Sequence, residues 1–231
     1  MSKPVVKQPG TNKKGLEWMQ TGAGLEFLAD LDQLSVQQQQ SAVEVIVDWE
    51  TKNRFAITNN KNQQVLFAGE ESTACQRWCC CLYRGFVMHL TNSEGQEVIR
   101  TERKFKCCSG CCWCANGGCG METTVESPPG NIIGYVRQLS SKWNAHFAIQ
   151  DADRNHLYTV WGMCCPCQGV CCTDDLEYPI MDKAETTVVG RIAKQWGGTS
   201  KELLTDADNF GIHFPADLDV KVKAILLAQF S

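Results

Sequence analysis

The chain has 231 residues, of which 43% are hydrophobic and 21% charged, so it is long enough and apolar enough for one or two domains with a buried core. Acidic residues outnumber Lys and Arg by 26 to 22, and this net charge of −4 argues against a general nucleic-acid binder, so DNA is not an expected partner. The longest apolar run is "VKAILLAQF", which is shorter than the ~18 residues that a membrane-spanning helix needs.

The first segment of the chain is basic. Residues 1–15 contain four lysines and no acidic residue, and residues 1–24 are therefore predicted to form a short flexible arm ahead of one domain over 25–231. This segment lacks the ~7–15-residue apolar run of a secretory signal, so we expect an intracellular protein with reduced thiols.

The first predicted elements follow this arm. "LEFLADLDQL" repeats leucine at Leu25, Leu28, Leu31 and Leu34, a spacing that predicts a helix over 25–34. The polar stretch 37–41, "QQQQS", is interpreted as a connector. "VEVIVDW" alternates apolar and polar residues and predicts a strand over 43–49.

One pattern then recurs four times: two apolar residues eight positions apart enclose residues that favour turns. Each predicts a β-hairpin, and the four cover 57–65, 90–98, 149–157 and 180–188. A fifth hairpin is predicted at Pro128-Pro129-Gly130. The similar spacing indicates either an internal duplication or a simple β-meander.

Ten or more short strands would leave open edges unless the sheet closes. A wide closed barrel has room for a central helix, and the apolar C-terminal segment has the composition of a buried helix. The sequence therefore predicts a mainly β protein, a closed antiparallel barrel around a C-terminal helix at about residues 219–230.

The fifteen cysteines form three clusters, and an odd number excludes a fully paired set of disulfides within one chain. Fatty acylation suits the central cluster, because its thiols follow the basic stretch "RKFK" at 103–106. Zinc is an alternative, since Cys111 with Cys114 and Cys164 with Cys167 have the spacing of paired ligands.

Several stretches resemble the phospholipid scramblase family, which has the tubby-like fold. They are "GLEFLADLDQL", "GQEVIRTER", the central cysteine cluster, "PPGNIIGYV" and, most distinctive, "TDADNFGIHFPADLDVKVKA" at 205–224. The resemblance implies a barrel of about twelve strands around a C-terminal helix. It also implies palmitoylation within the central cluster, for which the candidates are Cys107, Cys108, Cys111, Cys112 and Cys114.

The same resemblance places weak calcium binding in the acidic segment 206–217. Compared with an EF-hand loop, the segment offers the carboxylates of Asp206, Asp208 and Asp217 and the backbone carbonyl of Phe210. The competing interpretation gives the segment a purely structural role, in which Asp and Asn residues form a turn while Phe210, Ile212 and Phe214 alternate into the core.

The resemblance implies a membrane protein that moves phospholipids between leaflets in both directions, dependent on calcium and independent of ATP. It would sit at the cytoplasmic face of the plasma membrane, and in the cytosol or nucleus if it is not acylated. No enzyme activity is expected, because the four histidines are scattered along the chain. The alternatives are a lipid-anchored interaction or signalling protein with protein partners, and a zinc-stabilised barrel.

Overall fold

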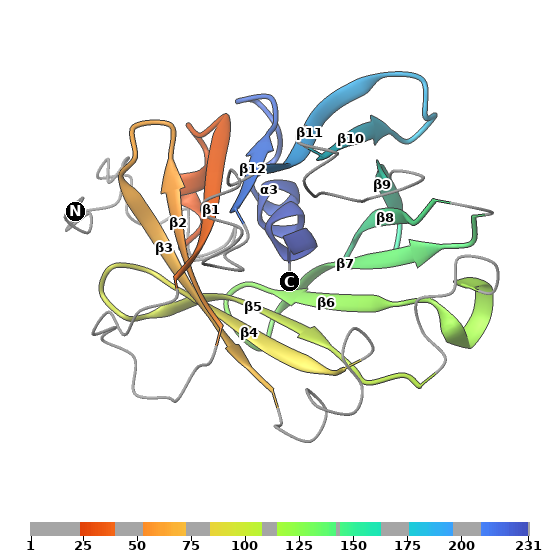
Figure 1. Cartoon of the computed structure of the whole chain (residues 1–231), viewed down its shortest axis with the longest axis horizontal. Helices are drawn as coiled ribbons and strands as arrows, with labels where there is room; N and C mark the ends of the chain where they lie inside the picture. Colours follow the sequence, from red (N-terminus) through yellow and green to blue (C-terminus); the bar gives the residue numbers. More distant parts are fainter. Residues whose placement is uncertain are drawn as a thin grey trace, which may run out of the picture.

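Twelve antiparallel strands close into a barrel around a C-terminal helix in the computed structural model (Figure 1). The structure describes residues 24–39, 53–72, 84–107, 115–141, 144–162, 176–195 and 209–230. The strands are β1 Gln33–Gln39, β2 Arg54–Asn59, β3 Gln64–Glu71, β4 Phe86–Thr91, β5 Glu97–Arg103, β6 Glu122–Glu126, β7 Ile132–Leu139, β8 His146–Asp151, β9 His156–Trp161, β10 Leu176–Asp182, β11 Val188–Gln195 and β12 Asn209–His213. The predicted fold class is confirmed.

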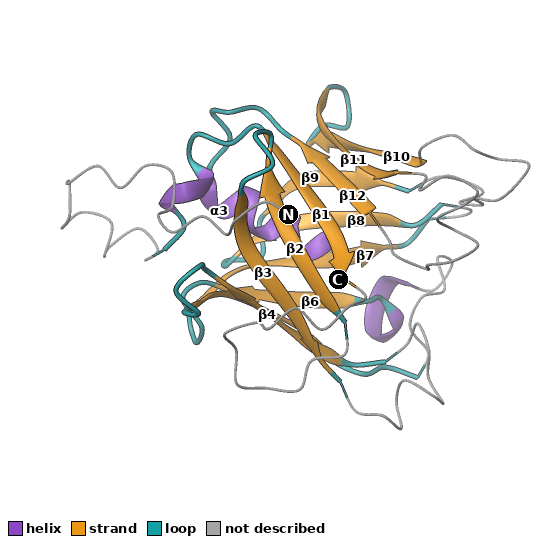
Figure 2. Ribbon diagram, turned by 60° about the vertical axis from the view of Figure 1, so that its left-hand side comes forward, coloured by secondary structure: helices purple, strands orange, loops and turns teal. Residues whose placement is uncertain are grey.

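The strands follow one another around the barrel in sequence order, and β12 closes it by pairing with β1. Because all neighbours are antiparallel, alternate connections lie at opposite ends. The five tight hairpins β2–β3, β4–β5, β6–β7, β8–β9 and β10–β11 therefore share one end, here called the hairpin end. The other connections begin and end at the opposite end, the connection end (Figure 2).

The five predicted hairpins are confirmed, and four of them share one turn. In each, an Asn or Asp begins the turn, its carbonyl accepts a hydrogen bond from the amide three residues later, and its side-chain oxygen accepts one or two further amides. These residues are Asn59, Asn92, Asp151 and Asp182. The residue three positions later has a positive φ, at Asn62, Gly95, Arg154 and Glu185.

The C-terminal helix fills the barrel, as predicted. Helix α3, Val220–Leu227, begins at the N-cap Asp219, whose carboxylate accepts the amides of Lys221 and Val222, and the 3-10 turn η5, Ala228–Phe230, follows it. Six consecutive residues of α3, from Val222 to Leu227, are buried. A helix that is buried on all sides needs apolar side chains all round, which explains the composition of this segment.

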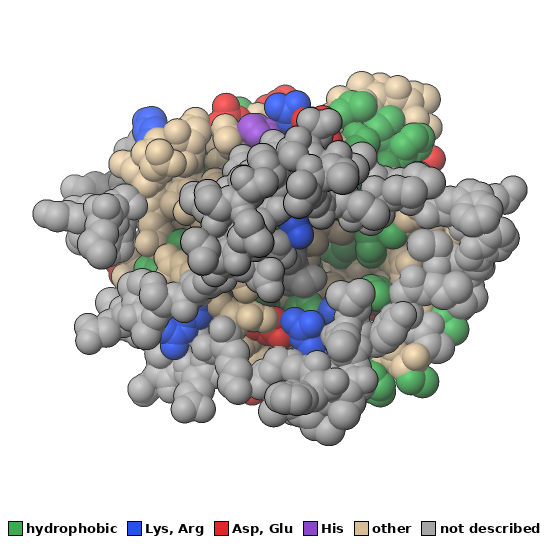
Figure 3. All heavy atoms as spheres, viewed as in Figure 1, with side chains coloured by type: hydrophobic (Ala, Val, Ile, Leu, Met, Phe, Trp, Pro, Cys, Tyr) green, Lys and Arg blue, Asp and Glu red, His purple; other side chains and the backbone are tan. Residues whose placement is uncertain are grey.

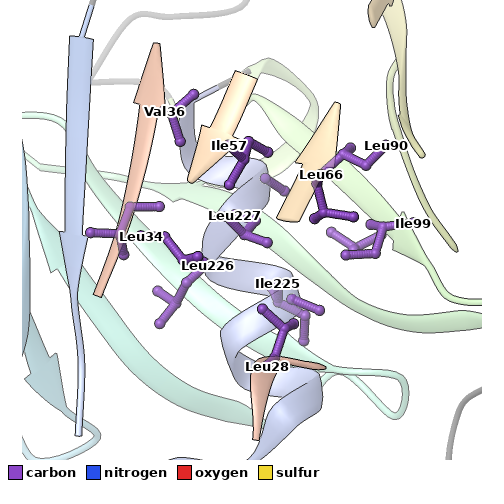
Figure 4. Close-up of a cluster of buried hydrophobic side chains, with 14 of the residues drawn as sticks. Leu28, Leu34, Val36, Ile57, Leu66, Leu90, Ile99, Ile225, Leu226 and Leu227 are labelled. Carbon is purple, nitrogen blue, oxygen red and sulfur yellow. The ribbon is translucent and has the colours of Figure 1, made fainter. Parts of the chain in front are cut away.

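The strands supply the inward-facing half of this core. Figure 4 shows Leu226 of α3 close to Leu34 of β1, and Leu227 facing Ile57 of β2 and Leu66 of β3. All five side chains are at most 1% exposed. Complete burial of one such side chain contributes about 1.5–3 kcal/mol.

Two predictions near the start of the domain are wrong. The only helical element within residues 25–34 is the 3-10 turn η2, Glu26–Leu28, and β1 begins at Gln33. All four leucines are nevertheless buried, so their spacing reported burial and not a helix. Residues 37–39 of the predicted connector belong to β1, because their backbones pair with β2. The predicted strand 43–49 and the arm up to residue 23 lie outside the described residues.

Candidate membrane-anchor and calcium segments

The central cysteine cluster lies in the β5–β6 connection, whose two ends are tied together. Strand β5 ends at Arg103, and the Lys106 ammonium, three residues later, donates a 2.9 Å hydrogen bond to the carbonyl of Gly120, just before β6. Cys107 follows and is exposed, whereas Cys119 on the returning side is half-buried. Cys107 is a free thiol. The Cys107 thiol is therefore accessible at a fixed point of the connection end.

The returning side of this connection is anchored on the barrel wall. Residues Ala115–Cys119 form the single π-helical turn η4, and Ala115 is wholly buried. A Cβ on Gly120 would lie 2.5 Å from the carbonyl oxygen of Ala115, so the close approach requires glycine here. The backbones of Met121 and Gln138 then join through a 2.8 Å hydrogen bond between the Gln138 amide and the Met121 carbonyl.

The Lys106–Gly120 hydrogen bond, which ties the two ends of this connection together, is here called the neck. Two arginines and one glutamate lie next to it. The Arg84 guanidinium makes two hydrogen bonds to the buried carboxylate of Glu70, at 3.1 and 2.9 Å. Burial alone would raise the pKa of Glu70, but the hydrogen bonds from Arg84, Asn53 and Ser72 lower it below its ordinary value. The Arg103 guanidinium stacks 4.3 Å from the Phe86 ring centre, where burial and the charge of Arg84 lower the pKa of Arg103 to about 10. Arg103 therefore remains charged at neutral pH.

The structure describes one of the five predicted lipidation sites, Cys107. Cys108, Cys111, Cys112 and Cys114 lie outside the described residues, as do both pairs of the zinc alternative. All fifteen cysteines nevertheless fall in the sequence between β3 and β4, between β5 and β6, or between β9 and β10. Each of these three connections leaves and re-enters the barrel at the connection end.

The predicted calcium segment is divided between a strand and a turn. Phe210 lies in β12, where it pairs with Val36 of β1 and Lys194 of β11, so its backbone belongs to the barrel wall. Asp217 is exposed in the turn after β12. Phe210 lies three residues before the end of β12, and this part of the strand alone spans about 10 Å. The structure therefore does not bring Phe210 and Asp217 together. Asp206 and Asp208 lie outside the described residues.

The core interpretation of this segment is confirmed: Ile212 and Phe214 are buried in the core, and the half-buried Phe210 packs against it. Among the residues that the structure describes, no group of three or more His, Cys, Asp or Glu side chains is arranged to hold a metal ion. The imidazole of His89 contacts two carboxylates, Glu97 at 2.7 Å and Glu71 at 3.1 Å.

A buried lysine near Asp217 was missed from the sequence. The Lys223 side chain of α3 is 0% exposed, and its ammonium donates to four backbone carbonyls at 2.8–3.0 Å. The acceptors are Leu28, Ala29, Leu31 and Ala216. Burial lowers the pKa of Lys223, and nearby carboxylates, including Asp30 and Asp217, oppose that effect. The ammonium thus joins the first segment of the domain to the last helix.

Within the described parts of the chain, none of the helices has the length and apolar character needed to cross a bilayer. The one α-helix among them, α3, lies inside the barrel.

Comparison with known proteins agrees with this architecture and these motifs. The model of the family described as Scramblase matches residues 14–231. The chain is 39% identical to phospholipid scramblase 1 of Rattus norvegicus over 97% of its own length and 68% of the relative's. It is 41% identical to phospholipid scramblase 1 of Homo sapiens over 88% of its own length and 62% of that protein's.

A third relative, phospholipid scramblase 2 of Bos taurus, is 39% identical over 97% of this chain and 78% of its own. No solved structure shows a significant match. The family match over nearly the whole chain, together with these identities, shows that the chain belongs to the scramblase family.

Proposed function

We propose that this protein is a phospholipid scramblase, which moves phospholipids in both directions between the leaflets of a membrane, independent of ATP and dependent on calcium. The observation that carries the proposal is the family match over residues 14–231, with relatives named phospholipid scramblases. Such movement makes and breaks no covalent bond in the lipid. It requires a polar route for headgroups across the hydrocarbon layer.

We propose that palmitate on the central cysteine cluster anchors the barrel at the cytoplasmic face of the plasma membrane. The exposed Cys107 thiol, which follows two lysines on a connection tied at its base, supports this step. One acyl chain binds a membrane only marginally, so stable anchoring needs a second chain or a basic patch. Cys108, Cys111, Cys112 and Cys114 are the further candidates for acylation.

The anchor is tested by the intact mass of the protein purified from cells. Mass increments of fatty acyl chains that disappear on treatment with hydroxylamine would support palmitoylation. Bound zinc on unmodified thiols would contradict it and favour ligation by Cys111, Cys114, Cys164 and Cys167. A Cys107→Ser variant with an unchanged number of acyl chains would exclude that residue.

For calcium, we propose that Asp206 and Asp208 contribute carboxylates ahead of β12. Because Phe210 lies in β12 and Asp217 in the turn after it, we propose a smaller role for Asp217 and the Phe210 carbonyl. Few hard oxygen ligands imply weak binding. Substituting both Asp206 and Asp208 by Ala is expected to abolish any calcium dependence of lipid exchange, and an Asp217→Ala variant serves as the comparison.

A lipid-anchored interaction protein without transport activity is the second candidate. The burial of α3 inside the barrel favours this candidate, because the apolar helix is already packed in the core. Exchange of a fluorescent phospholipid between the leaflets of vesicles that contain the acylated protein separates the two. Exchange above that of protein-free vesicles supports the scramblase, and its absence with and without calcium supports the interaction protein.

A further inference from the structure

The two ends of the barrel differ in charge. At the hairpin end, the five tight turns and segments 29–32 and 214–219 contain nine carboxylates and only three basic side chains. The carboxylates are Asp30, Asp32, Glu94, Asp151, Asp153, Asp182, Glu185, Asp217 and Asp219, and the bases are Lys61, Arg154 and Lys183. Figure 3 shows acidic side chains along the upper edge of the view, near the ends of β1 and β12. An anionic surface would repel this end.

One side of the connection end is basic instead. We call Arg84, Arg103, Lys104, Phe105 and Lys106 the basic rim. Described residues of the β3–β4, β5–β6 and β7–β8 connections include three bases of this rim and no acidic residue. Four carboxylates lie nearby, of which Glu70 is paired with Arg84 and Glu122 with Arg154. The remaining bases Arg103, Lys104 and Lys106 exceed the remaining carboxylates Glu71 and Glu102 by one positive charge.

The basic rim also presents an aromatic side chain to solvent. Phe105 is 45% exposed, between exposed Lys104 and half-buried Lys106, and exposed Cys107 comes next. Lysines reach headgroup phosphates while their stems lie along apolar surface, and an exposed aromatic ring favours the interfacial region of a bilayer. The order of bases, ring and thiol therefore suits contact with lipid.

The sequence of the same three connections continues this chemistry outside the described residues. Segments 73–83, 108–114 and 142–143 each contain one tryptophan. Together they contain two basic residues and no carboxylate. The connections after β1, β9 and β11 differ, because segments 40–52, 163–175 and 196–208 contain eight acidic residues and two lysines. In the sequence, the connections with more basic than acidic residues are thus those after β3, β5 and β7.

We propose that the basic rim docks the barrel on the anionic face of a phospholipid bilayer. The barrel then meets the membrane by the side of the connection end that includes β3 to β6, and the acidic hairpin end faces water. The inference takes the membrane as partner from the proposed function but requires neither lipid exchange nor calcium. An acyl chain on Cys107 would enter the bilayer beside the same residues.

The test is sedimentation of the full chain, produced without acylation, with vesicles of phosphatidylcholine alone or with about 30% phosphatidylserine. The wild-type protein is expected to bind the anionic vesicles, less so as salt rises. Each basic residue near such a surface contributes roughly fivefold in affinity, so Lys104→Glu with Lys106→Glu is expected to lose about 25-fold or more. The matched control, Lys61→Glu with Lys183→Glu at the hairpin end, changes the net charge equally and is expected to stay within about twofold.

Two further variants keep the test decisive if loss of the Lys106–Gly120 bond disturbs folding. Lys104→Glu alone removes an exposed side chain and is expected to lose about fivefold. Phe105→Ser is expected to weaken binding without changing its salt dependence. Equal losses in the rim and control variants, binding that ignores phosphatidylserine, or tighter binding to a DNA duplex than to the anionic vesicles would each overturn the proposal.

Failure of the rim and failure of the proposed function are distinguishable. If the rim variants bind like wild type while the acylated protein exchanges lipid, the docking surface is wrong and the scramblase proposal stands. If they lose binding while the acylated wild type exchanges no lipid, the rim stands and the scramblase proposal fails.

Discussion

Replacing Lys223 by Met tests the contact between the last helix, α3, and the first segment of the domain. The change removes the buried ammonium but keeps an unbranched side chain of similar length. It leaves four carbonyls without this donor, of which those of Leu28 and Leu31 are in buried hydrogen bonds. The Leu28 carbonyl keeps a hydrogen bond from the Leu31 amide at 3.2 Å, so the Leu31 carbonyl is the buried one that loses its partner. Such a loss costs about 1–3 kcal/mol.

The release of the ammonium from its buried position opposes this loss. Burying a charge costs several kcal/mol, although removing only one partner of a buried polar group generally destabilises. We therefore expect a net destabilisation of about 2 kcal/mol, and a melting temperature lower by roughly 4–8 °C for a chain of this size.

The assay is equilibrium unfolding in urea, followed by circular dichroism and tryptophan fluorescence. Lys221→Met is the matched control, since Lys221 is exposed on the same helix two residues away; its free energy of unfolding should change by less than about 0.5 kcal/mol. A Lys223→Met protein as stable as the wild type would refute the reasoning that the four carbonyls need this donor.

Three further predictions concern the helix, an ion pair and the anchor. A Cβ on Gly134 would lie 2.3 Å from both the carbonyl oxygen of Gln150 in β8 and Cδ1 of Ile225 in α3, so Gly134→Ala is expected to destabilise the barrel by about 1–3 kcal/mol in the same unfolding assay. The folded-state pKa of Glu70 lies below its ordinary value, so its contribution to stability is present above about pH 4.5 and is lost as pH falls through the folded-state pKa. Glu70→Gln should therefore lower the free energy of unfolding at pH 7 by about 3 kcal/mol. The variant should also lose part of the acid dependence of its stability. Cys107→Ser should lower the membrane-bound fraction in cells, measured by fractionation.

Each of these has an outcome that would count against it. Unchanged stability of Gly134→Ala would mean that neither α3 nor the backbone of β8 lies as close to Gly134 as the structure shows. A Glu70→Gln protein whose stability falls between pH 6 and pH 3 as steeply as that of wild type would show that Arg84 and Glu70 do not carry the acid sensitivity. An unaltered distribution of Cys107→Ser would assign anchoring to other cysteines.

The barrel was predictable because hairpins are local. An Asn or Asp at the start of the turn and apolar residues eight positions apart lie within one short window, and the structure places them as expected at Asn59 and Asp182. The spacing of Leu25 and Leu28 was ambiguous, since it suits a helix and also any segment that turns its apolar side chains to the core. The shared turn geometry fits a duplication and a simple meander equally.

The contacts that fix the candidate site were not predictable, because they join distant positions. Lys223 contacts the carbonyl of Leu28, 195 positions away, and no local pattern encodes such a contact. A lysine inside an otherwise apolar helix was the available signal. The neck formed by Lys106 and Gly120 and the split of the calcium segment at β12 likewise depend on which strands pair.

The central claim is that this barrel moves phospholipid, and one measurement tests it most directly. The acylated protein is reconstituted into vesicles that carry a fluorescent phospholipid, and a membrane-impermeant quencher reports how much label reaches the outer leaflet with and without calcium. The account predicts that calcium raises exchange above that of protein-free vesicles, and that the Asp206→Ala, Asp208→Ala double variant loses this increase. Exchange no faster than in protein-free vesicles at any calcium concentration would contradict it.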